Sequence, residues 1–228
     1  MTLGFPRLHF RVTDSTNERA RELAARGVPH GTLVTAREQS AGRGRQGRTW
    51  SAAPGRAVLC SLVIRRPPRL LPLAAGVAVA ELVGDQAQIK WPNDVLVDGR
   101  KVAGVLVEGR PQEGWAVLGI GLNVAQREED FLPELRQLAG SLGLGVEAVE
   151  PTLARLLLRL ERWIGARPEA VLEAVRERDA LLGRSIRWSG VRGEGAGIDT
   201  EGRLLVRTET GELAVEAGEV HIATGAPS

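Results

Sequence analysis

Hydrophobic and polar positions in the first part of the chain alternate between strand-like and helix-like patterns. Short apolar runs typical of strands lie at residues 8–12, 32–36, 57–64 and 115–124. Longer helix-like runs lie at residues 15–26 and 70–83, each followed by a glycine. Two further apolar runs, 94–97 and 101–107, flank Asp98-Gly99, a dipeptide that favours a tight turn. We therefore expect these two strands to pair antiparallel.

From residue 151 onward the pattern changes. Helices are expected at 151–164, where leucines recur at helical spacing, and at 168–182, which begins with a proline. Beyond Gly183 the chain breaks into short strands separated by glycine-containing turns, as a small all-β barrel requires. We therefore expect two domains, residues 1–182 and 183–228.

Composition narrows the class of protein. Of 228 residues, 43% are hydrophobic and 25% charged, and the formal net charge of +2 weakens a nucleic-acid hypothesis based on bulk charge. The single cysteine, Cys60, lies in an apolar run and predicts a buried, inert thiol, and the scattered histidines match no metal-ligand spacing. No protein-built metal site is expected. A cytoplasmic location with no membrane partner is expected, because the sequence shows neither a signal-peptide pattern nor a membrane-length apolar stretch.

The loop after the strand at 32–36 matches the dinucleotide-binding pattern G-x-G-x-x-G at residues 42–47. That motif needs a helix directly after it and a carboxylate roughly 20 positions further on. Pro54 and Gly55 break any such helix, and residues 61–66 contain no carboxylate. A dinucleotide-binding site of the Rossmann type is therefore excluded.

The same loop instead carries Arg43, Arg45 and Arg48 between glycines that leave the backbone free to move. A guanidinium group can donate two parallel hydrogen bonds to the oxygens of one carboxylate or phosphate, so these arginines predict a site for a small polyanion. The alternative is a solvated, disordered arginine–glycine segment, which the flanking strands disfavour. Trp50, directly after the loop, could be a core aromatic or could stack on a purine.

Lys90 and Lys101 are the only lysines in the chain. Lys90 could form an ion pair with Asp94, whereas Lys101 begins an apolar strand and is expected to aim its ammonium into a pocket.

Ser15 and Glu18 match a capping box at the start of the first helix. The small hydroxyls at this helix N-terminus could also bind a polar ligand head.

Five segments, in order, closely resemble the motifs of biotin–protein ligases. They are Asp-Ser-Thr-Asn (14–17), Glu-Gln-Ser-Ala-Gly-Arg-Gly-Arg-Gln-Gly-Arg-Thr-Trp (38–50), Lys-Trp-Pro-Asn-Asp-Val (90–95), Lys-Val-Ala-Gly-Val-Leu-Val-Glu (101–108) and Gly-Ile-Gly-Leu-Asn-Val (119–124). The resemblance implies an α+β fold in which a mixed, largely antiparallel sheet packs with helices, as in class II aminoacyl-tRNA synthetases and biotin ligases. A small SH3-like β-barrel is implied to follow.

The resemblance also implies a two-step, ATP-dependent ligase. Biotin's carboxylate attacks the α-phosphate of MgATP to give biotinyl-5′-AMP and pyrophosphate. A lysine of a biotin carboxyl carrier protein domain, from acetyl-CoA carboxylase or a related biotin-dependent carboxylase, then attacks the anhydride. Biotin, ATP and Mg²⁺ carried with ATP are the implied small molecules, and a homodimer is among the oligomeric states left open.

Roles for individual residues follow from the resemblance by motif position. The residues implied to bind biotin are Ser15, Thr16, Gln39, Gly42, Arg43, Lys101 and Gly104. The residues implied to bind the nucleotide are Arg45, Arg48, Trp50, Lys90 and Asn123. Catalytic roles fall to Arg43, to Lys101, which bridges the carboxylate and the α-phosphate, and to Asp94, which assists near the incoming amine.

Two departures from the family pattern change the expectation. Gln46 occupies a loop position that is often basic, which softens the grip on phosphate. Few residues precede the first strand, so we expect a form without an N-terminal helix-turn-helix domain and without specific DNA binding.

Two rival hypotheses are a lipoate–protein ligase, which shares the architecture without this arginine loop, and a nucleic-acid-binding module. The second is disfavoured because aromatic residues make up only 4% of the chain, with no tyrosine.

Overall fold

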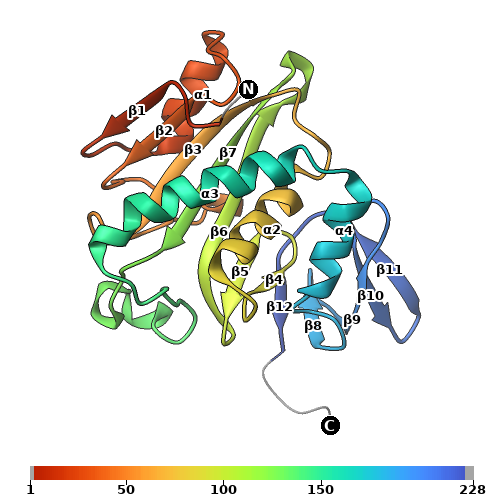
Figure 1. The fold of residues 1–228 in the computed structure, drawn as a ribbon. Helices are drawn as coiled ribbons and strands as arrows, with labels where there is room; N and C mark the ends of the chain where they lie inside the picture. Colours follow the sequence, from red (N-terminus) through yellow and green to blue (C-terminus); the bar gives the residue numbers. More distant parts are fainter. Residues whose placement is uncertain (1–2, 224–228) are drawn as a thin grey trace.

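A computed structural model describes residues 3–223 and shows a large sheet flanked by helices, with a smaller sheet beside it (Figure 1). The elements up to the last long helix are β1 (Arg7–Phe10), α1 (Thr16–Ala25), β2 (Leu33–Ala36), η1 (Arg45–Gly47), β3 (Ala57–Arg65), α2 (Leu71–Val83), β4 (Gln88–Lys90), β5 (Asp94–Val97), β6 (Arg100–Arg110), η2 (Pro111–Glu113), β7 (Trp115–Asn123), η3 (Glu128–Asp130), η4 (Pro133–Leu135), η5 (Val146–Ala148), α3 (Val149–Ile164) and α4 (Pro168–Glu177). The C-terminal strands are β8 (Ser185–Trp188), β9 (Val191–Ile198), β10 (Leu204–Thr208), β11 (Gly211–Val215) and β12 (Val220–Ile222).

The large sheet has the strand order β1-β2-β3-β7-β6-β5-β4. Only β1 and β2 pair parallel, and the other neighbouring strands pair antiparallel. The expected mixed, largely antiparallel sheet is confirmed, as is the hairpin at Asp98-Gly99, where both residues have positive φ. Strand β4 was not predicted, because three residues are too few to show a period-two pattern.

The two faces of this sheet are covered by different helices. Successive strand residues point to opposite faces, so Val63 packs with Ala20 and Ala24 of α1, whereas Leu62 packs into the larger core with α2 and α3. Helix α2 is apolar nearly all round because it lies between the sheet, α3 and α4. Figure 1 shows α2 and α3 lying across the sheet. Helix α1 packs mainly against strands β2, β3 and β7 of the sheet and has few contacts with β4, β5 and β6.

The C-terminal strands form a five-stranded antiparallel sheet with the order β11-β10-β9-β8-β12, which confirms the expected small all-β unit. The helix expected at 168–182 ends at Glu177, so the last five predicted positions were wrong. The reason is tertiary: the Ile89 amide of β4 donates to the Arg178 carbonyl (2.7 Å), and the Ala180 amide donates to the Ile89 carbonyl (3.0 Å). The division at residue 182 stays a prediction. In residues 3–223, no helix combines the length and the hydropathy needed to cross a membrane.

Helix α3 allows a matched test of this packing. Leu156 is fully buried, whereas Leu158, two residues further along the same helix, is 68% exposed. Leu156→Ala is expected to lower the free energy of unfolding by about 2–5 kcal/mol, because it removes buried methyl groups and leaves a cavity. Leu158→Ala is expected to change it by less than about 0.5 kcal/mol. Urea unfolding followed by circular dichroism measures both, and equal losses would contradict the assigned orientation of α3.

Candidate active site

A pocket of about 120 Å³ lies on the sheet face that α1 leaves open, just beyond the N-terminus of that helix. Its walls come from the start of α1, the arginine loop, the turn between β4 and β5, strands β3, β6 and β7, and residues 218–220 before and within β12. Of the site residues predicted from the sequence, it brings together Ser15, Thr16, Gln39, Arg43, Arg45, Arg48, Trp50, Lys90, Asp94, Lys101 and Gly104. Segments far apart in the chain therefore converge on one cavity.

Paired glycines form the floor of the pocket under the Trp50 indole. Gly104 of β6 and Gly121 of β7 are directly opposite each other in the sheet. A Cβ at Gly104 would lie 3.1 Å from the Trp50 ring, and a Cβ at Gly121 would collide with it. Any side chain at these positions would fill the space on the sheet, so glycine is required for a flat group to lie there.

Lys101 reaches this pocket because of a β-bulge. Asp94 pairs with Gly104 and Leu96 pairs with Lys101, so Val102 is an extra residue in β6. The extra residue puts Lys101 and Gly104, three positions apart, on the same face of the sheet, where strict alternation would separate them. The Lys101 ammonium then lies 2.7 Å from Asp94 Oδ1 and 5.6 Å from the centre of the Trp50 ring.

The alternative in which Lys90 pairs with Asp94 is not what the structure shows. The two residues are neighbours across β4 and β5, but the carboxylate of Asp94 pairs with Lys101 instead. Within residues 3–223, no carboxylate lies within ion-pair distance of Lys90. Burial is the main reason that the pKa of Lys90 is lowered, with Asp94 opposing the shift and Lys101 and Arg48 adding to it. An anionic ligand at Lys90 would offset the cost of burying this charge.

Each arginine of the loop lines the pocket while it contacts a protein group. Arg43 forms an ion pair with Glu18 of α1 (3.0 Å), Arg45 donates to Asn93 Oδ1 (3.0 Å), and Arg48 forms an ion pair with Glu219 of the C-terminal unit. The loop closes on itself, because the Gly44 amide donates to the Arg48 carbonyl at 2.7 Å. It is therefore an ordered segment, and the hypothesis of a disordered arginine–glycine tract is wrong. Gln46 adopts a left-handed φ of 54° in η1.

Ser15, Thr16 and Gln39 gather at the other end of the pocket. The Thr16 amide and hydroxyl both donate to Gln39 Oε1, at 2.7 and 3.0 Å. The predicted capping box is wrong: Ser15 caps α1 without a side-chain hydrogen bond, and Glu18 is turned toward Arg21 and Arg43. The Ser15 hydroxyl is therefore left to face the pocket.

Two predicted site residues do not line the pocket. Asn123 is buried at the end of β7, and its Nδ2 donates to the Gly140 carbonyl at 2.8 Å. Gly42 lies behind the loop, where a Cβ would collide with the Trp50 carbonyl and lie 2.8 Å from Gln39 Nε2. Gly42 therefore allows two segments to approach, and any contact of Asn123 with a ligand stays a prediction.

The comparisons with known proteins agree with this geometry. Residues 9–124 match the model of the biotin/lipoate A/B protein ligase family. The chain belongs to this family. A bifunctional ligase/repressor BirA from Bacillus subtilis is 34% identical over 96% of this chain and 75% of that protein. A biotin–[acetyl-CoA-carboxylase] ligase from Mycobacterium tuberculosis is 35% identical over 91% of this chain and 85% of its own length.

A solved structure, the biotin protein ligase from Aquifex aeolicus in complex with biotin and ATP, superposes with a TM-score of 0.81. That protein is 26% identical, and the match covers 95% of this chain and 99% of the Aquifex chain. The resemblance to biotin–protein ligases inferred from the motifs is thereby confirmed, and so is the fold class.

Sequence reasoning missed several residues of this ligase-family pocket. Glu219, Gly218 and Val220 line it from the C-terminal unit, and no local pattern distinguishes them from other residues of a small barrel. Glu108 does not line the pocket but contacts Arg43, and its place at the end of the motif at 101–108 could have drawn attention to it. Among residues 3–223, no cluster of histidine, cysteine, aspartate and glutamate could hold a metal ion. Cys60 also lines the pocket, but burial raises the pKa of its thiol to about 12 and makes it inert, as expected.

The lowered pKa of Lys90 predicts that anion binding at this pocket depends on pH. Because its pKa lies below the ordinary lysine value, its positive charge is lost at a lower pH than that of a solvated lysine. Inorganic pyrophosphate serves as a probe of the site. Its binding is expected to weaken as the pH rises toward the pKa of Lys90, because Lys90 then loses its positive charge. The weakening should begin at a lower pH in the natural protein than in Lys90→Arg, because arginine stays charged. Titration calorimetry at several pH values measures this, and parallel profiles for the two proteins would contradict it.

Proposed function

We propose that this protein is a biotin–protein ligase that forms biotinyl-5′-AMP from biotin and ATP and transfers the biotinyl group to a lysine of a carrier protein. The observation that carries the proposal is one pocket with a polar recess at one end and arginine and lysine side chains at the other. The relatives and solved structures with biotin-ligase names support this substrate over lipoate.

The polar recess fits the bicyclic head of biotin. Ser15 and Thr16 present hydroxyl groups, and Gln39 has an amide that can donate as well as accept. These groups are buried or half-buried, so a ligand that pairs with them gains specificity over one that leaves them without partners. The Trp50 indole lies on the glycine floor and lines the pocket, so the rest of the ring system can pack against it.

The cations address the main obstacle of the first step. A carboxylate must approach a triphosphate of the same sign, and negative charge grows on the α-phosphate in the transition state. Fixed positive groups in a pocket with little water stabilise that charge. Arg43 lies nearest the recess and is assigned to biotin's carboxylate, Lys101 to the space between carboxylate and phosphate, and Arg45 and Arg48 to the phosphates.

The ion pair between Lys101 and Asp94 serves both steps of the proposed reaction. With the pocket empty, Asp94 offsets the repulsion between Lys101 and its cationic neighbours. In the second step the acceptor lysine must lose a proton, because with an ordinary pKa near 10.4 only about 0.04% of it is neutral at pH 7. Asp94 has a carboxylate at the pocket and is the proposed acceptor of that proton.

Arg48 links nucleotide binding to the C-terminal unit. Its guanidinium is paired with Glu219 through Nη2, so its other N–H groups can bind phosphate oxygens when ATP binds. The loop would thereby close over the acyl adenylate and exclude water, which would otherwise hydrolyse it.

The carrier partner is the biotin carboxyl carrier domain of acetyl-CoA carboxylase or of a related biotin-dependent carboxylase. The names of the relatives support this partner. The cytoplasmic location, a homodimer and the lack of specific DNA binding stay predictions.

The direct test is to incubate the protein with biotin, MgATP and a purified biotin carrier domain and to follow the carrier's mass. The carrier is expected to gain one biotinyl group. Arg43→Ala and Lys101→Ala should each slow biotinylation of the carrier by about 100-fold or more, since each removes a fixed cation that stabilises the transition state. Arg192→Ala serves as the control, because Arg192 is exposed on β9 outside the pocket. Full activity of the two pocket variants would overturn the site assignment.

Exchange of pyrophosphate into ATP separates the two candidate acids. Exchange is expected with biotin, and at most about 1% of that rate with lipoate, because the recess that holds the ureido head has unpaired polar groups when lipoate binds. Equal or faster exchange with lipoate would overturn the assignment of biotin as the substrate.

A further inference from the structure

A run of polar contacts behind the pocket joins its two ends. The members, which we call the polar relay, lie in contact in the order Gln39, Thr16, Ser61, Asn17, Glu108 and Arg43. They come from the arginine loop and the segment before it, the first turn of α1, and strands β3 and β6. The residues assigned to biotin's head and the arginine assigned to its carboxylate are thus the two ends of one connected set.

The buried half of the polar relay is fixed by short hydrogen bonds. Ser61 of β3 is fully buried, and its hydroxyl lies 2.8 Å from Thr16 Oγ1 and 2.6 Å from Asn17 Oδ1. Asn17 in turn donates from Nδ2 to Glu108 Oε2 at 2.8 Å. A Cβ at Gly119 would collide with Asn17 Oδ1, so glycine at that position leaves the room that Asn17 needs. Ser61 has one hydroxyl proton, which can go to Thr16 or to Asn17, so these contacts fix the positions of the groups and not a single assignment of protons.

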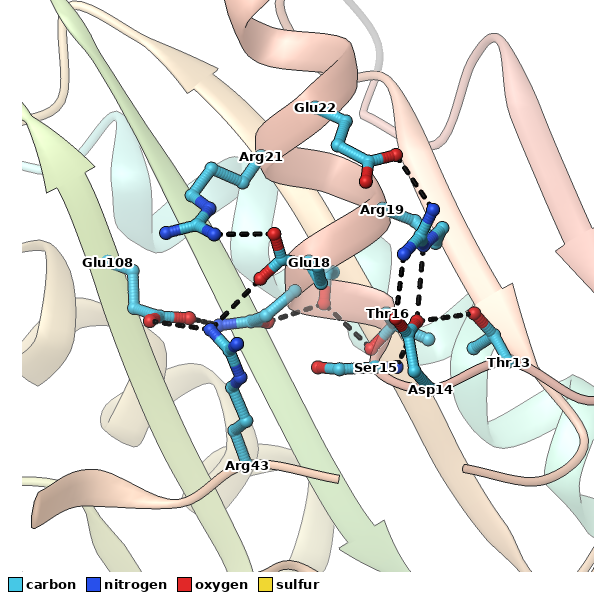
Figure 2. Close-up of polar contacts among 12 residues, drawn as sticks. Thr13, Asp14, Ser15, Thr16, Glu18, Arg19, Arg21, Glu22, Arg43 and Glu108 are labelled. Atoms are coloured by element: carbon cyan, nitrogen blue, oxygen red, sulfur yellow. Dashed lines mark hydrogen bonds and ion pairs between the residues drawn. The ribbon is translucent and has the colours of Figure 1, made fainter. Parts of the chain in front are cut away.

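The exposed half of the polar relay is the guanidinium of Arg43, which lies between two carboxylates. Arg43 Nη1 is 3.0 Å from Glu18 Oε2 and 3.7 Å from Glu108 Oε1 (Figure 2). Figure 2 also shows that Glu18 is shared with Arg21, its neighbour on α1. Both contacts of Arg43 use Nη1, and within residues 3–223 its Nε and Nη2 have no hydrogen-bond partner. The unoccupied edge of the guanidinium is therefore available to a ligand.

Arg43 is 44% exposed at its side chain and follows a glycine, so it would sample many rotamers without these carboxylates. An arginine already held in its binding rotamer loses less conformational entropy when an anion arrives. Glu18 and Glu108 come from a helix and a strand, whose positions are fixed by the sheet core. They can thus set where the guanidinium lies relative to Thr16 and Gln39.

We propose that Glu18 and Glu108 are positioning residues that hold Arg43 Nη1 so that its other nitrogens face the substrate carboxylate. Through Asn17 and Ser61, Glu108 fixes this position relative to the groups that bind the substrate's head. The pocket thereby favours a carboxylate at one distance from a polar ring. This inference rests on the proposed function, because it takes biotin as the ligand.

The test compares binding of biotin with binding of biotinol, the analogue in which the carboxylate is replaced by an alcohol, by titration calorimetry without ATP. Glu18→Gln and Glu108→Gln keep the size of each side chain and remove its charge, and the amide oxygen introduced by Glu108→Gln can still accept from Asn17. Each variant is expected to weaken biotin binding about threefold to tenfold and to change biotinol binding by less than about twofold. In an Arg43→Ala background neither change should alter biotin affinity further, as expected for groups that act through Arg43.

Glu22→Gln is the matched control on α1. Glu22 pairs with Arg19 at 2.9 Å and has no contact with Arg43, so biotin affinity should not change. Equal weakening of biotin and biotinol would overturn the proposal, because it would indicate a general disturbance of the pocket. Tighter biotin binding would also overturn it, because the carboxylates would then compete with the substrate for Arg43. If the natural protein binds neither compound, the proposed function itself fails and this inference fails with it.

Discussion

Positive charges gathered in one pocket repel one another, and the site depends on how that repulsion is offset before any substrate binds. Arg43, Arg48 and Lys101 each pair with a carboxylate, and Arg45 donates to an amide oxygen. Those partners come from α1, the C-terminal unit and the turn and strand around β5. Lys90 and Arg45 are the exceptions, because burial lowers the pKa of each and neither forms an ion pair within residues 3–223. The fold itself thus offsets the charge of Arg43, Arg48 and Lys101.

The sheet provides the second condition, which is room. Helix α1 covers one face of β2, β3 and β7, and its N-terminus borders the pocket. Next to this helix end, the glycines of β6 and β7 leave the surface of the sheet without side chains. The Trp50 indole lies on that surface and forms a wall of the pocket. The start of α1 supplies hydroxyls at the border of this area. Where α1 begins therefore sets both the limit of the packed core and the start of the binding surface.

The C-terminal unit is part of the site and not an appendage. Glu219 pairs with Arg48 of the loop, and the Gly202 carbonyl accepts a hydrogen bond of 2.9 Å from Trp91 Nε1 in the turn between β4 and β5. One hydrophobic core also includes residues of both units, among them Leu73 and Leu204. A change in the C-terminal sheet can therefore reach the end of the pocket lined by Arg45 and Arg48 through the arginine loop.

The sequence by itself determined most of the element types, the hairpin at Asp98-Gly99, the family and the arginine, lysine and hydroxyl side chains of the pocket, because these depend on local periodicity, turn chemistry and motifs of contiguous residues. Tertiary structure alone decided which groups pair. The bulge at Val102 places Lys101 next to Asp94. Glu18 pairs with Arg43 and does not form the predicted capping box. Glu219 pairs with Arg48, although the two residues are far apart in the sequence. Ion-pair partners depend on distances across the folded sheet, and no local pattern in the chain specifies those distances.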